Sequence, residues 1–370
     1  MFVLFRNFIG LSGLLFSVGC LPVEETPAVD EVSVGTVTSD IIDGNSAQDW
    51  MQQRAALVVG SKICSGTIIS ATHVLTAAHC LPAAGTTTVQ FYNNSTLPMA
   101  AKLGVTNVAF RPGVNPFNDD LTDTNGDFAD MAILTLAAPI PATSQPSPLA
   151  IFYPGSDGVG IQVGNGNHDG VVNSSGELRW APNEMYSDDN SVGFFYTNND
   201  RTDKGDSGGP IYTDRELQGD LWGYWYVAFA YRNKYTAVSY HLPWILSTIN
   251  YQGSFSSITT DTRLNGTLIE NIGTSDLNTC KLHCMQTSYC AAFNHWPYPI
   301  SLCQTLSDVS GTDSPFGGVV SGVADRESPG AGCSAAGDST GILGLVMAGL
   351  LRRRWARRKP AASGRRASNA

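Results

Sequence analysis

Residues 205–210 read Gly-Asp-Ser-Gly-Gly-Pro, and this hexapeptide decides the fold together with two stretches that precede it. Residues 74–80 read Val-Leu-Thr-Ala-Ala-His-Cys, and residues 130–134 read Asp-Met-Ala-Ile-Leu. Each stretch alone is weak evidence, because a histidine before a cysteine is often structural and a glycine-rich hexapeptide is often a turn. The three together contain, in this order, the candidate catalytic residues His79, Asp130 and Ser207.

Short β-rich runs separated by turn residues surround these stretches and predict a mostly β structure. The expected strands are Ala55–Val59, Thr67–Ile69, Val74–Ala77, Thr87–Tyr92, Met131–Leu136 and Tyr224–Ala230. Charged residues make up only 15% of the 370-residue chain, whereas it holds 38 glycines and 19 prolines, which favours short strands over long amphipathic helices. This spacing suits a sandwich or a pair of closed barrels.

The motifs resemble the chymotrypsin/trypsin family of serine proteases. The resemblance implies a double six-stranded Greek-key β-barrel over residues 41–250, and a serine endopeptidase that acts on protein or peptide substrates without a cofactor or metal. Ser207 would be the nucleophile, and because a serine hydroxyl is weakly nucleophilic at neutral pH, the imidazole of His79 would take its proton. Asp130 would hold the imidazole in the required tautomer and stabilise the imidazolium.

The resemblance also implies two structural features around the nucleophile. The backbone N–H groups of Gly205 and Ser207 would form an oxyanion hole, and glycine at position 205 would let the backbone approach the substrate closely. Cys64 and Cys80 would form a disulfide that ties down the histidine loop. Free thiols are the alternative, which an exported chain disfavours.

Residues 41–44, Ile-Ile-Asp-Gly, resemble the mature N-terminus of the family, where Ile-Val-Gly-Gly is usual. Cleavage after Asp40 would free the α-amino group of Ile41, and the resemblance implies that this ammonium pairs with Asp206. A buried carboxylate without its partner is costly, so we expect the uncut chain to be a poorly active zymogen. Asp43 in place of glycine is a departure from the family pattern.

The family sets the base of its primary specificity pocket six residues before the nucleophile, where this chain has Arg201. An arginine there would favour acidic side chains, which agrees with an activation site after Asp40 and suggests self-activation. The family's cysteines that bracket this pocket are absent, so the pocket walls are expected to differ. Ala228, Phe229 and Ala230 are either the strand that pairs with substrate or an ordinary buried strand.

Residues 1–20 are typical of a signal peptide, with Arg6 near the start and an apolar run from Phe8 to Val18. They predict export from a bacterial cell into an oxidising compartment, so the protein would be secreted or held at the cell surface. Residues 17–20, Ser-Val-Gly-Cys, resemble a bacterial lipoprotein box, so lipidation of Cys20 and ordinary signal cleavage both stay open. Residues 21–40 are expected to be a propeptide or linker.

Residues 254–324 contain four of the eight cysteines and are expected to form a second, smaller module. Residues 277–284, 290–294 and 302–306 resemble the PAN/apple fold, a disulfide-bonded α+β module that binds proteins or carbohydrates. The module would therefore dock the enzyme on a protein or carbohydrate ligand.

The four cysteines of this module have two interpretations. The resemblance suggests two disulfides, Cys280–Cys303 and Cys284–Cys290, although sequence alone allows three connectivities. The four-residue spacing of Cys280 and Cys284 predicts that both thiols lie on one helical face. A zinc site that combines the cysteines with His283 or His295 is the less favoured alternative.

Residues 325–370 begin with a linker rich in Pro, Gly and Ser and continue through Cys333 to an apolar run, Gly341–Leu351, and an arginine-rich tail. The apolar run is well short of the roughly 20 residues of a bilayer-spanning helix. The arrangement resembles the C-terminal sorting signals of some Gram-negative bacteria, with Cys333 at the processing site; a tail with a weak hydrophobic patch is the alternative. Attachment to the membrane or cell surface through Cys20 or Cys333 is therefore open.

Three other classes of function can be weighed on the sequence. The net charge of −10 argues against nucleic-acid binding, because an acidic body repels phosphate backbones. A catalytically silent binding protein that acts through the second module is disfavoured because no triad residue is missing. An esterase is disfavoured because the motifs are not those of a strand-turn-helix nucleophile elbow.

The acidic loop 119–127 has the wrong register for an EF-hand, which favours a solvated loop over a calcium site.

Overall fold

The computed structural model describes residues 41, 44–81, 87–117, 121–154, 158–166, 177–187, 192–198, 202–227 and 230–325. Several predicted features lie outside these residues: the signal peptide with Cys20, Asp40, Arg201, Ala228, Phe229, and the C-terminal segment with Cys333. In the described ranges, no helix has both the length and the apolar character needed to cross a membrane.

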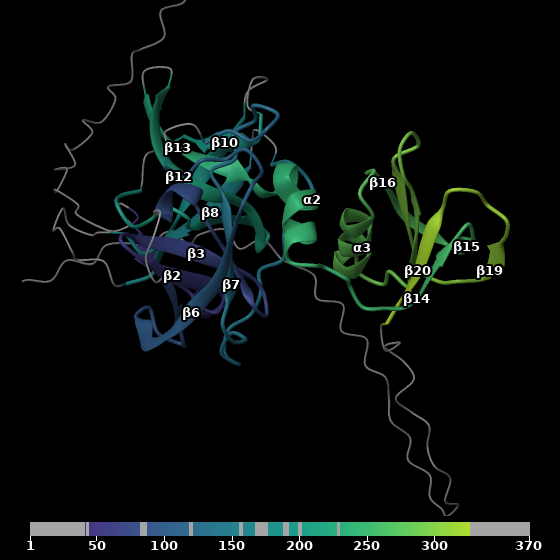
Figure 1. The fold of residues 1–370 in the computed structure, drawn as a ribbon, viewed down its shortest axis with the longest axis horizontal. Helices are drawn as coiled ribbons and strands as arrows, with labels where there is room; N and C mark the ends of the chain where they lie inside the picture. The colour runs from purple at the N-terminus through teal and green to yellow at the C-terminus, as the bar shows by residue number, and fades with distance from the viewer. Residues whose placement is uncertain are drawn as a thin grey trace, which may run out of the picture. The chain divides into compact units, whose positions relative to one another are not determined.

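The first barrel is a closed antiparallel ring of strands in the order β2-β3-β4-β7-β6-β5 (Figure 1). Its strands are β2 Ala55–Val59, β3 Ile63–Ser70, β4 His73–Thr76, β5 Thr88–Tyr92, β6 Pro98–Phe110 and β7 Ala132–Leu136. Ile68, Val74 and Leu134 have no exposed surface and belong to one apolar cluster of this barrel. Burial of such β-branched and leucine side chains is the main stabilising contribution to a small barrel.

The second barrel closes in the same way, because β8 pairs with β9 as well as with β11 and completes the order β9-β10-β13-β12-β11-β8. Its strands are β8 Val159–Gly164, β9 Arg179–Tyr186, β10 Phe194–Thr197, β11 Pro210–Thr213, β12 Glu216–Val227 and β13 Ala230–Ala237, and β1 Asn45–Ser46 adds to β9. The short helices are α1 Asp49–Gln52, the 3-10 turn Ala78–Cys80, and α2 Val238–Thr248 after β13. The prediction of a mostly β fold with two six-stranded barrels is confirmed.

The predicted strand Tyr224–Ala230 is wrong. β12 ends at Val227, β13 begins at Ala230, and these two residues pair with each other, so the segment spans the end of a long hairpin (Figure 1). The sequence from Tyr224 to Ala230 contains no glycine, proline, asparagine or aspartate. These residues are the usual marks of a turn, so the pattern carries no signal for the reversal of the chain.

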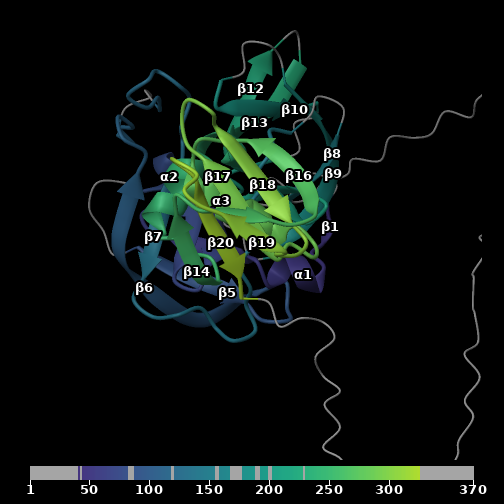
Figure 2. The same ribbon diagram turned by 90° about the vertical axis from the view of Figure 1, so that its right-hand side faces the viewer.

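Residues 254–325 form a five-stranded antiparallel sheet in the order β14-β20-β17-β18-β16, together with helix α3 (Figure 2). The elements are β14 Phe255–Thr260, β15 Arg263–Asn265, β16 Leu268–Gly273, α3 Leu277–Gln286, β17 Ala292–Trp296, β18 Leu302–Leu306, β19 Gly311–Asp313 and β20 Val320–Ala324. Helix α3 is capped by Asp276, the residue before its first turn, whose carboxylate accepts a hydrogen bond from the Thr279 backbone N–H at 2.6 Å. This is the usual way to satisfy a free N–H group at the start of a helix.

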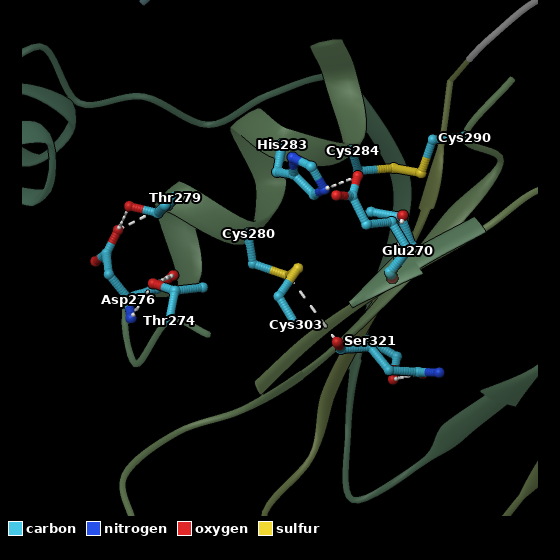
Figure 3. The surroundings of a disulfide bond; sticks show 12 residues. Glu270, Thr274, Asp276, Thr279, Cys280, His283, Cys284, Cys290, Cys303 and Ser321 are labelled. Carbon is cyan, nitrogen blue, oxygen red and sulfur yellow. Dashed lines mark hydrogen bonds and ion pairs between the residues drawn. A yellow bond between two sulfur atoms is a disulfide. The ribbon is translucent and has the colours of Figure 1, made fainter. Parts of the chain in front are cut away.

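Two disulfides hold α3 to the rest of this module. Cys280 bonds to Cys303 on β18, and Cys284 bonds to Cys290 just before β17 (Figure 3). All four thiols of the zinc alternative are therefore used in disulfides. His283 instead faces Glu270, with 3.3 Å between Nε2 and Oε2.

Leu75 tests the contribution to stability of the apolar cluster that contains residues of both barrels, because it has no exposed surface and shares this cluster with Val163 and Tyr212. It lies on β4, next to the histidine loop. We expect Leu75→Ala to lower the free energy of unfolding by about 2–5 kcal/mol, since it leaves a cavity in a packed core. Urea unfolding followed by tryptophan fluorescence measures the change. Lys102→Ala on the exposed part of β6 is the control, and an equal effect of both changes would contradict the assignment of Leu75 to the core.

Candidate active site

His79 and Asp130 come from neighbouring strands of the first barrel. Thr76, at the end of β4, pairs with Ala132, at the start of β7, so the segments that carry the two side chains leave the sheet at the same edge. His79 Nδ1 lies 2.6 Å from Asp130 Oδ2, and the His79 backbone N–H donates to Asp130 Oδ1 at 2.9 Å. The carboxylate thus holds both the ring and the backbone of His79.

The surroundings differ sharply between these two side chains. The Asp130 side chain has no exposed surface, whereas the His79 side chain is 25% exposed. The hydroxyl of Thr236 on β13 donates to the Asp130 backbone carbonyl at 3.1 Å, which fixes the carboxylate-bearing segment against the second barrel. Because Nδ1 is engaged by Asp130, Nε2 is the ring nitrogen that is left for chemistry in the cleft.

Ser207 comes from the second barrel, in the turn before β11. Its carbonyl accepts from the Ser65 backbone N–H at 2.8 Å, and the N–H of Gly208 donates to the Leu221 carbonyl at 2.8 Å. Gly208 has a φ of 80°, and a Cβ atom there would lie 2.3 Å from the Ser65 carbonyl oxygen. Only glycine fits this turn, which explains the glycine that follows the serine.

Ser207 and His79 line one cleft of about 820 Å³. The Ser207 hydroxyl donates to the backbone carbonyl of Trp222 at 3.4 Å. The other residues that line the cleft are Lys62, Pro116, Phe117, Leu121, Thr202, Asp203, Lys204, Leu221, Trp222, Gly223 and Tyr224. Sequence analysis did not identify these residues. For Lys62 and Lys204 the available signal was their position two residues before Cys64 and three residues before Ser207.

Gly205 occupies a second position that requires glycine. Its φ is 102°, and its carbonyl accepts from the Ser65 hydroxyl at 2.9 Å, while that hydroxyl accepts from the Asn165 N–H at 3.0 Å. A Cβ atom at position 205 would lie 3.0 Å from the Cα atom of Gly166. The orientation of the backbone just before Ser207 is therefore set by Ser65.

The disulfide Cys64–Cys80 forms next to His79 and joins β3 to the histidine turn. The Lys62 ammonium donates to the His79 carbonyl at 3.2 Å, so the same segment holds the turn at two points. A cross-link across 16 residues stabilises mainly by restricting the unfolded chain. The predicted pair of cysteines is thus brought together beside the histidine.

Asp206 is fully buried next to Ser207, and its carboxylate accepts from the backbone N–H groups of Gly166 at 2.7 Å and Asp203 at 2.9 Å. Burial raises the pKa of Asp206 to about 7, although these two hydrogen bonds favour the ionised form. Ile41 is also buried, and a Cβ atom built on Gly164 would lie 2.1 Å from Asp206 Oδ1 and 3.1 Å from Ile41 Cδ1. Ile41 and Asp206 therefore lie against the same glycine.

In the segment expected to form the specificity pocket, the structure describes the chain from Thr202, the residue after Arg201. The Thr202 hydroxyl donates to Asn233 Oδ1 at 2.8 Å, and the Asn233 amide donates to Gln162 Oε1 at 3.2 Å. A buried polar network thus supports this wall. Ala230, the described residue of the predicted segment 228–230, pairs with Val227 at the end of the β12–β13 hairpin. The cleft is lined by four consecutive residues of β12, Leu221, Trp222, Gly223 and Tyr224.

The described part of the acidic loop, residues 121–127, is held by hydrogen bonds within the loop and by hydrogen bonds from Arg111 and Tyr240. Asp123 accepts from the N–H groups of Asn125 and Asp127 and from Arg111 Nε, and the Tyr240 hydroxyl donates to Asp127 at 2.5 Å. In the part of the chain that the structure describes, no group of three or more His, Cys, Asp or Glu side chains could hold a metal ion.

A family model and the curated relatives of this chain point to the same family. The family model described as Trypsin matches residues 41–245. The chain is 29% identical over 226 residues to Trypsin-3 of Salmo salar, covering 53% of this chain and 87% of that protein. It is 25% identical over 250 residues to Trypsin alpha of Drosophila erecta, and the match covers 63% of this chain and 93% of that protein. A solved structure, "Neuropsin, a serine protease expressed in the limbic system of mouse brain", matches 56% of this chain and 99% of its own at 21% identity and a TM-score of 0.46.

The raised pKa of Asp206 predicts a pH-dependent stability for the uncut chain. The folded state binds a proton more tightly than the unfolded state does, so this contribution is present below about pH 4 and is lost as the pH rises to about 7. Relative to Asp206→Asn, the native chain should lose a few kcal/mol of unfolding free energy between pH 4 and pH 8. Urea titrations at several pH values measure this difference. Asp313→Asn, at an exposed carboxyl on β19, is the control for the substitution itself. A difference between the native chain and Asp206→Asn that stays constant with pH would contradict the burial of Asp206 as a neutral acid.

Proposed function

The chain belongs to the trypsin family of serine proteases, and from this premise we propose that it is a serine endopeptidase that cleaves peptide bonds through an acyl-enzyme on Ser207. The observation that carries the proposal is the hydrogen-bonded pair of Asp130 and His79 at the wall of the cleft that also contains Ser207. A buried carboxylate, an imidazole with one free nitrogen and a hydroxyl are the three groups that this reaction needs.

The proposed reaction begins when the Ser207 hydroxyl turns from the Trp222 carbonyl toward His79 Nε2. The imidazole takes the hydroxyl proton as Oγ attacks the substrate carbonyl carbon, and Asp130 stabilises the imidazolium that results. The backbone N–H groups of Gly205 and Ser207 bind the oxyanion. His79 then gives its proton to the leaving amine, and water attacks the acyl-enzyme by the same route to release the acid.

The proposed activation step is cleavage between Asp40 and Ile41. It is supported by the burial of Ile41 beside Gly164 and Asp206, since an α-amino group freed there would compensate a buried carboxylate. The ammonium would also lower the pKa of Asp206 from about 7 and so hold it ionised at neutral pH. The turn that contains Gly205 and Ser207 would then be ordered for catalysis.

The proposed substrates are proteins or peptides with an acidic residue on the acyl side of the cleaved bond. The support for this preference is the sequence position of Arg201, six residues before Ser207, where the family sets the base of its pocket, and the presence of Asp40 at the proposed activation site. The two lysines that line the cleft, Lys62 and Lys204, add positive charge to its walls. Opposite charges in a cleft raise the local concentration of such substrates.

The proposed role of residues 254–324 is docking, in the manner of a PAN/apple module, on a protein or carbohydrate. Its support is a five-stranded sheet held to one helix by two disulfides. The three disulfides among the described residues also support export to an oxidising compartment, the cell surface or the medium. Anchoring through Cys20 or Cys333 remains part of this proposal.

Removal of the nucleophile tests the proposed reaction. Ser207→Ala should lower kcat for peptide hydrolysis by about 10⁴- to 10⁶-fold, because the residues of a triad act as one unit. Both chains carry the recognition site of another protease directly before Ile41, and peptide turnover is measured after that protease has been shown by N-terminal sequencing to leave Ile41 as the first residue. Ser256→Ala, an exposed hydroxyl on β14, is the matched control and should keep full activity. Equal rates for the two variants would refute the proposal, and a correctly processed native chain without turnover would favour a silent binding protein.

Incubation of the purified full chain without other proteases tests self-activation. We expect the native chain to generate a new N-terminus at Ile41 and the Ser207→Ala chain to stay uncut, because the cut requires its own nucleophile. Edman sequencing or mass spectrometry identifies the cut. Processing of the isolated Ser207→Ala chain between Asp40 and Ile41 would rule out self-activation. An Asp40→Ala chain should stay uncut if the acidic residue directs the cleavage.

A further inference from the structure

Ser65 lies on β3 of the first barrel, but its hydroxyl bonds to two segments of the second barrel. The residue is 1% exposed. Its Oγ atom accepts from the backbone N–H of Asn165, just after β8, at 3.0 Å and donates to the carbonyl of Gly205, before β11, at 2.9 Å. Because the Asn165 N–H is itself a donor, the hydroxyl hydrogen is left for the Gly205 carbonyl. The direction of this buried hydroxyl is thus determined by its two partners.

The backbone of Ser65 is held as firmly as its side chain. Its N–H donates to the Ser207 carbonyl at 2.8 Å, and its carbonyl accepts from the Thr76 hydroxyl at 2.8 Å. The preceding residue, Cys64, is bonded to Cys80. The hydroxyl therefore projects from a fixed point of the first barrel, as a group that positions another group must do.

The peptide group that Ser65 binds lies between the two proposed oxyanion donors. It joins Gly205 to Asp206, and along the chain it stands between the N–H groups of Gly205 and Ser207. Gly205 has a φ of 102° and no side chain, so rotation of this peptide group meets little steric resistance. Its N–H donates to the Asp203 carbonyl at 3.1 Å, and among the described residues Ser65 is the one donor to its carbonyl. Hydrogen bonds at the two ends therefore set its orientation.

The same hydroxyl is connected to the segment that surrounds the Asp206 carboxylate. Gly166, the residue after Asn165, donates its N–H to Asp206 Oδ1 at 2.7 Å. Two consecutive N–H groups of this segment thus bind the carboxylate and the Ser65 hydroxyl. The hydroxyl bridges the segment to the peptide group before the nucleophile, and so joins the proposed activation pocket to the proposed oxyanion hole.

We propose that Ser65 is a positioning residue of this site: its hydroxyl fixes the peptide group between Gly205 and Asp206 so that the N–H groups of Gly205 and Ser207 point at the oxyanion. The inference rests on the proposed peptidase function for its catalytic meaning. Ser65 does not touch the substrate and acts through the backbone that it orients. Donors that are oriented in advance stabilise charge that develops only in the transition state, so the hydroxyl should contribute to kcat and not to substrate binding.

Removal of the hydroxyl tests the inference in chains that an added protease has cut directly before Ile41. Ser65→Ala should lower kcat for peptide hydrolysis by about 10- to 100-fold and leave KM within about twofold. Loss of a whole oxyanion donor costs about 10²- to 10³-fold, whereas here both donors remain and lose only their fixed orientation. Thr67→Val is the matched control, because it removes a hydroxyl from an equally buried residue of the same strand, and it should keep kcat.

A spectroscopic measurement separates positioning from a general loss of stability. The cut chains are acylated on Ser207 with cinnamoyl imidazole carrying ¹³C at its carbonyl, and the carbonyl stretch of the acyl-enzyme is recorded by infrared difference spectroscopy. Hydrogen bonds from the oxyanion donors lower this frequency. The band should therefore move to higher frequency in Ser65→Ala and stay in place in Thr67→Val.

Hydrogen exchange tests the positioning without requiring activity. In the Ser207→Ala background, which prevents self-cleavage, the amides of residues 203–209 should exchange faster when Ser65→Ala is added and not when Thr67→Val is added. If Ser65→Ala does not fold, as judged by its thermal transition, Ser65→Gly supplies the same comparison.

The outcomes distinguish this inference from the proposed function. An unchanged kcat and carbonyl band in Ser65→Ala, or equal effects of the two substitutions, would overturn the role of Ser65 while leaving the peptidase function intact. Absence of turnover in the cut native chain would refute the proposed function. The exchange rates of residues 203–209 would then still decide whether Ser65 orders the turn, since equal rates in both variants would overturn that role.

Discussion

The burial of the Asp130 carboxylate is the constraint on which the site depends. A carboxylate with no exposed surface is stable only when donors and cations replace water. The backbone and ring of His79 supply two hydrogen bonds, and they can do so because β4 and β7 are neighbours whose ends meet at one edge of the first barrel. Thr236 fixes the same segment from the second barrel, so the position of the carboxylate requires both barrels to be in place.

The nucleophile turn is held by a different kind of constraint, which is close backbone packing. Gly205 and Gly208 adopt positive φ angles with neighbouring atoms at distances that exclude a side chain. Ser65 connects the two halves of this arrangement, because its N–H donates to the Ser207 carbonyl and its hydroxyl donates to the Gly205 carbonyl. The turn also buries Asp206 without a cation among the contacts described above, which is the physical basis of the proposed activation by a new N-terminus.

Much of this arrangement could be predicted from the sequence, because it is encoded in short local motifs. The glycines on both sides of Ser207, the pair Cys64 and Cys80, and the β-rich runs of the first barrel all have local signatures. The hairpin of β12 and β13 could not be located, since residues 224–230 lack the usual turn residues. The cluster of Lys234 with three aromatic rings could not be identified either, because the rings of Phe128, Phe194 and Trp222 come from three separate segments.

The central claim is that Ser207 is an activated nucleophile, and the most direct measurement is peptide mapping after reaction with a fluorophosphonate. The purified chain and its His79→Ala variant are cut by an added protease at a site introduced directly before Ile41, treated with the probe, digested and examined by mass spectrometry. The account predicts one phosphonylated peptide that contains Ser207, and loss of this modification when His79 is replaced by alanine. A chain that begins at Ile41 but carries no probe on Ser207, or carries it equally well without His79, would contradict the account.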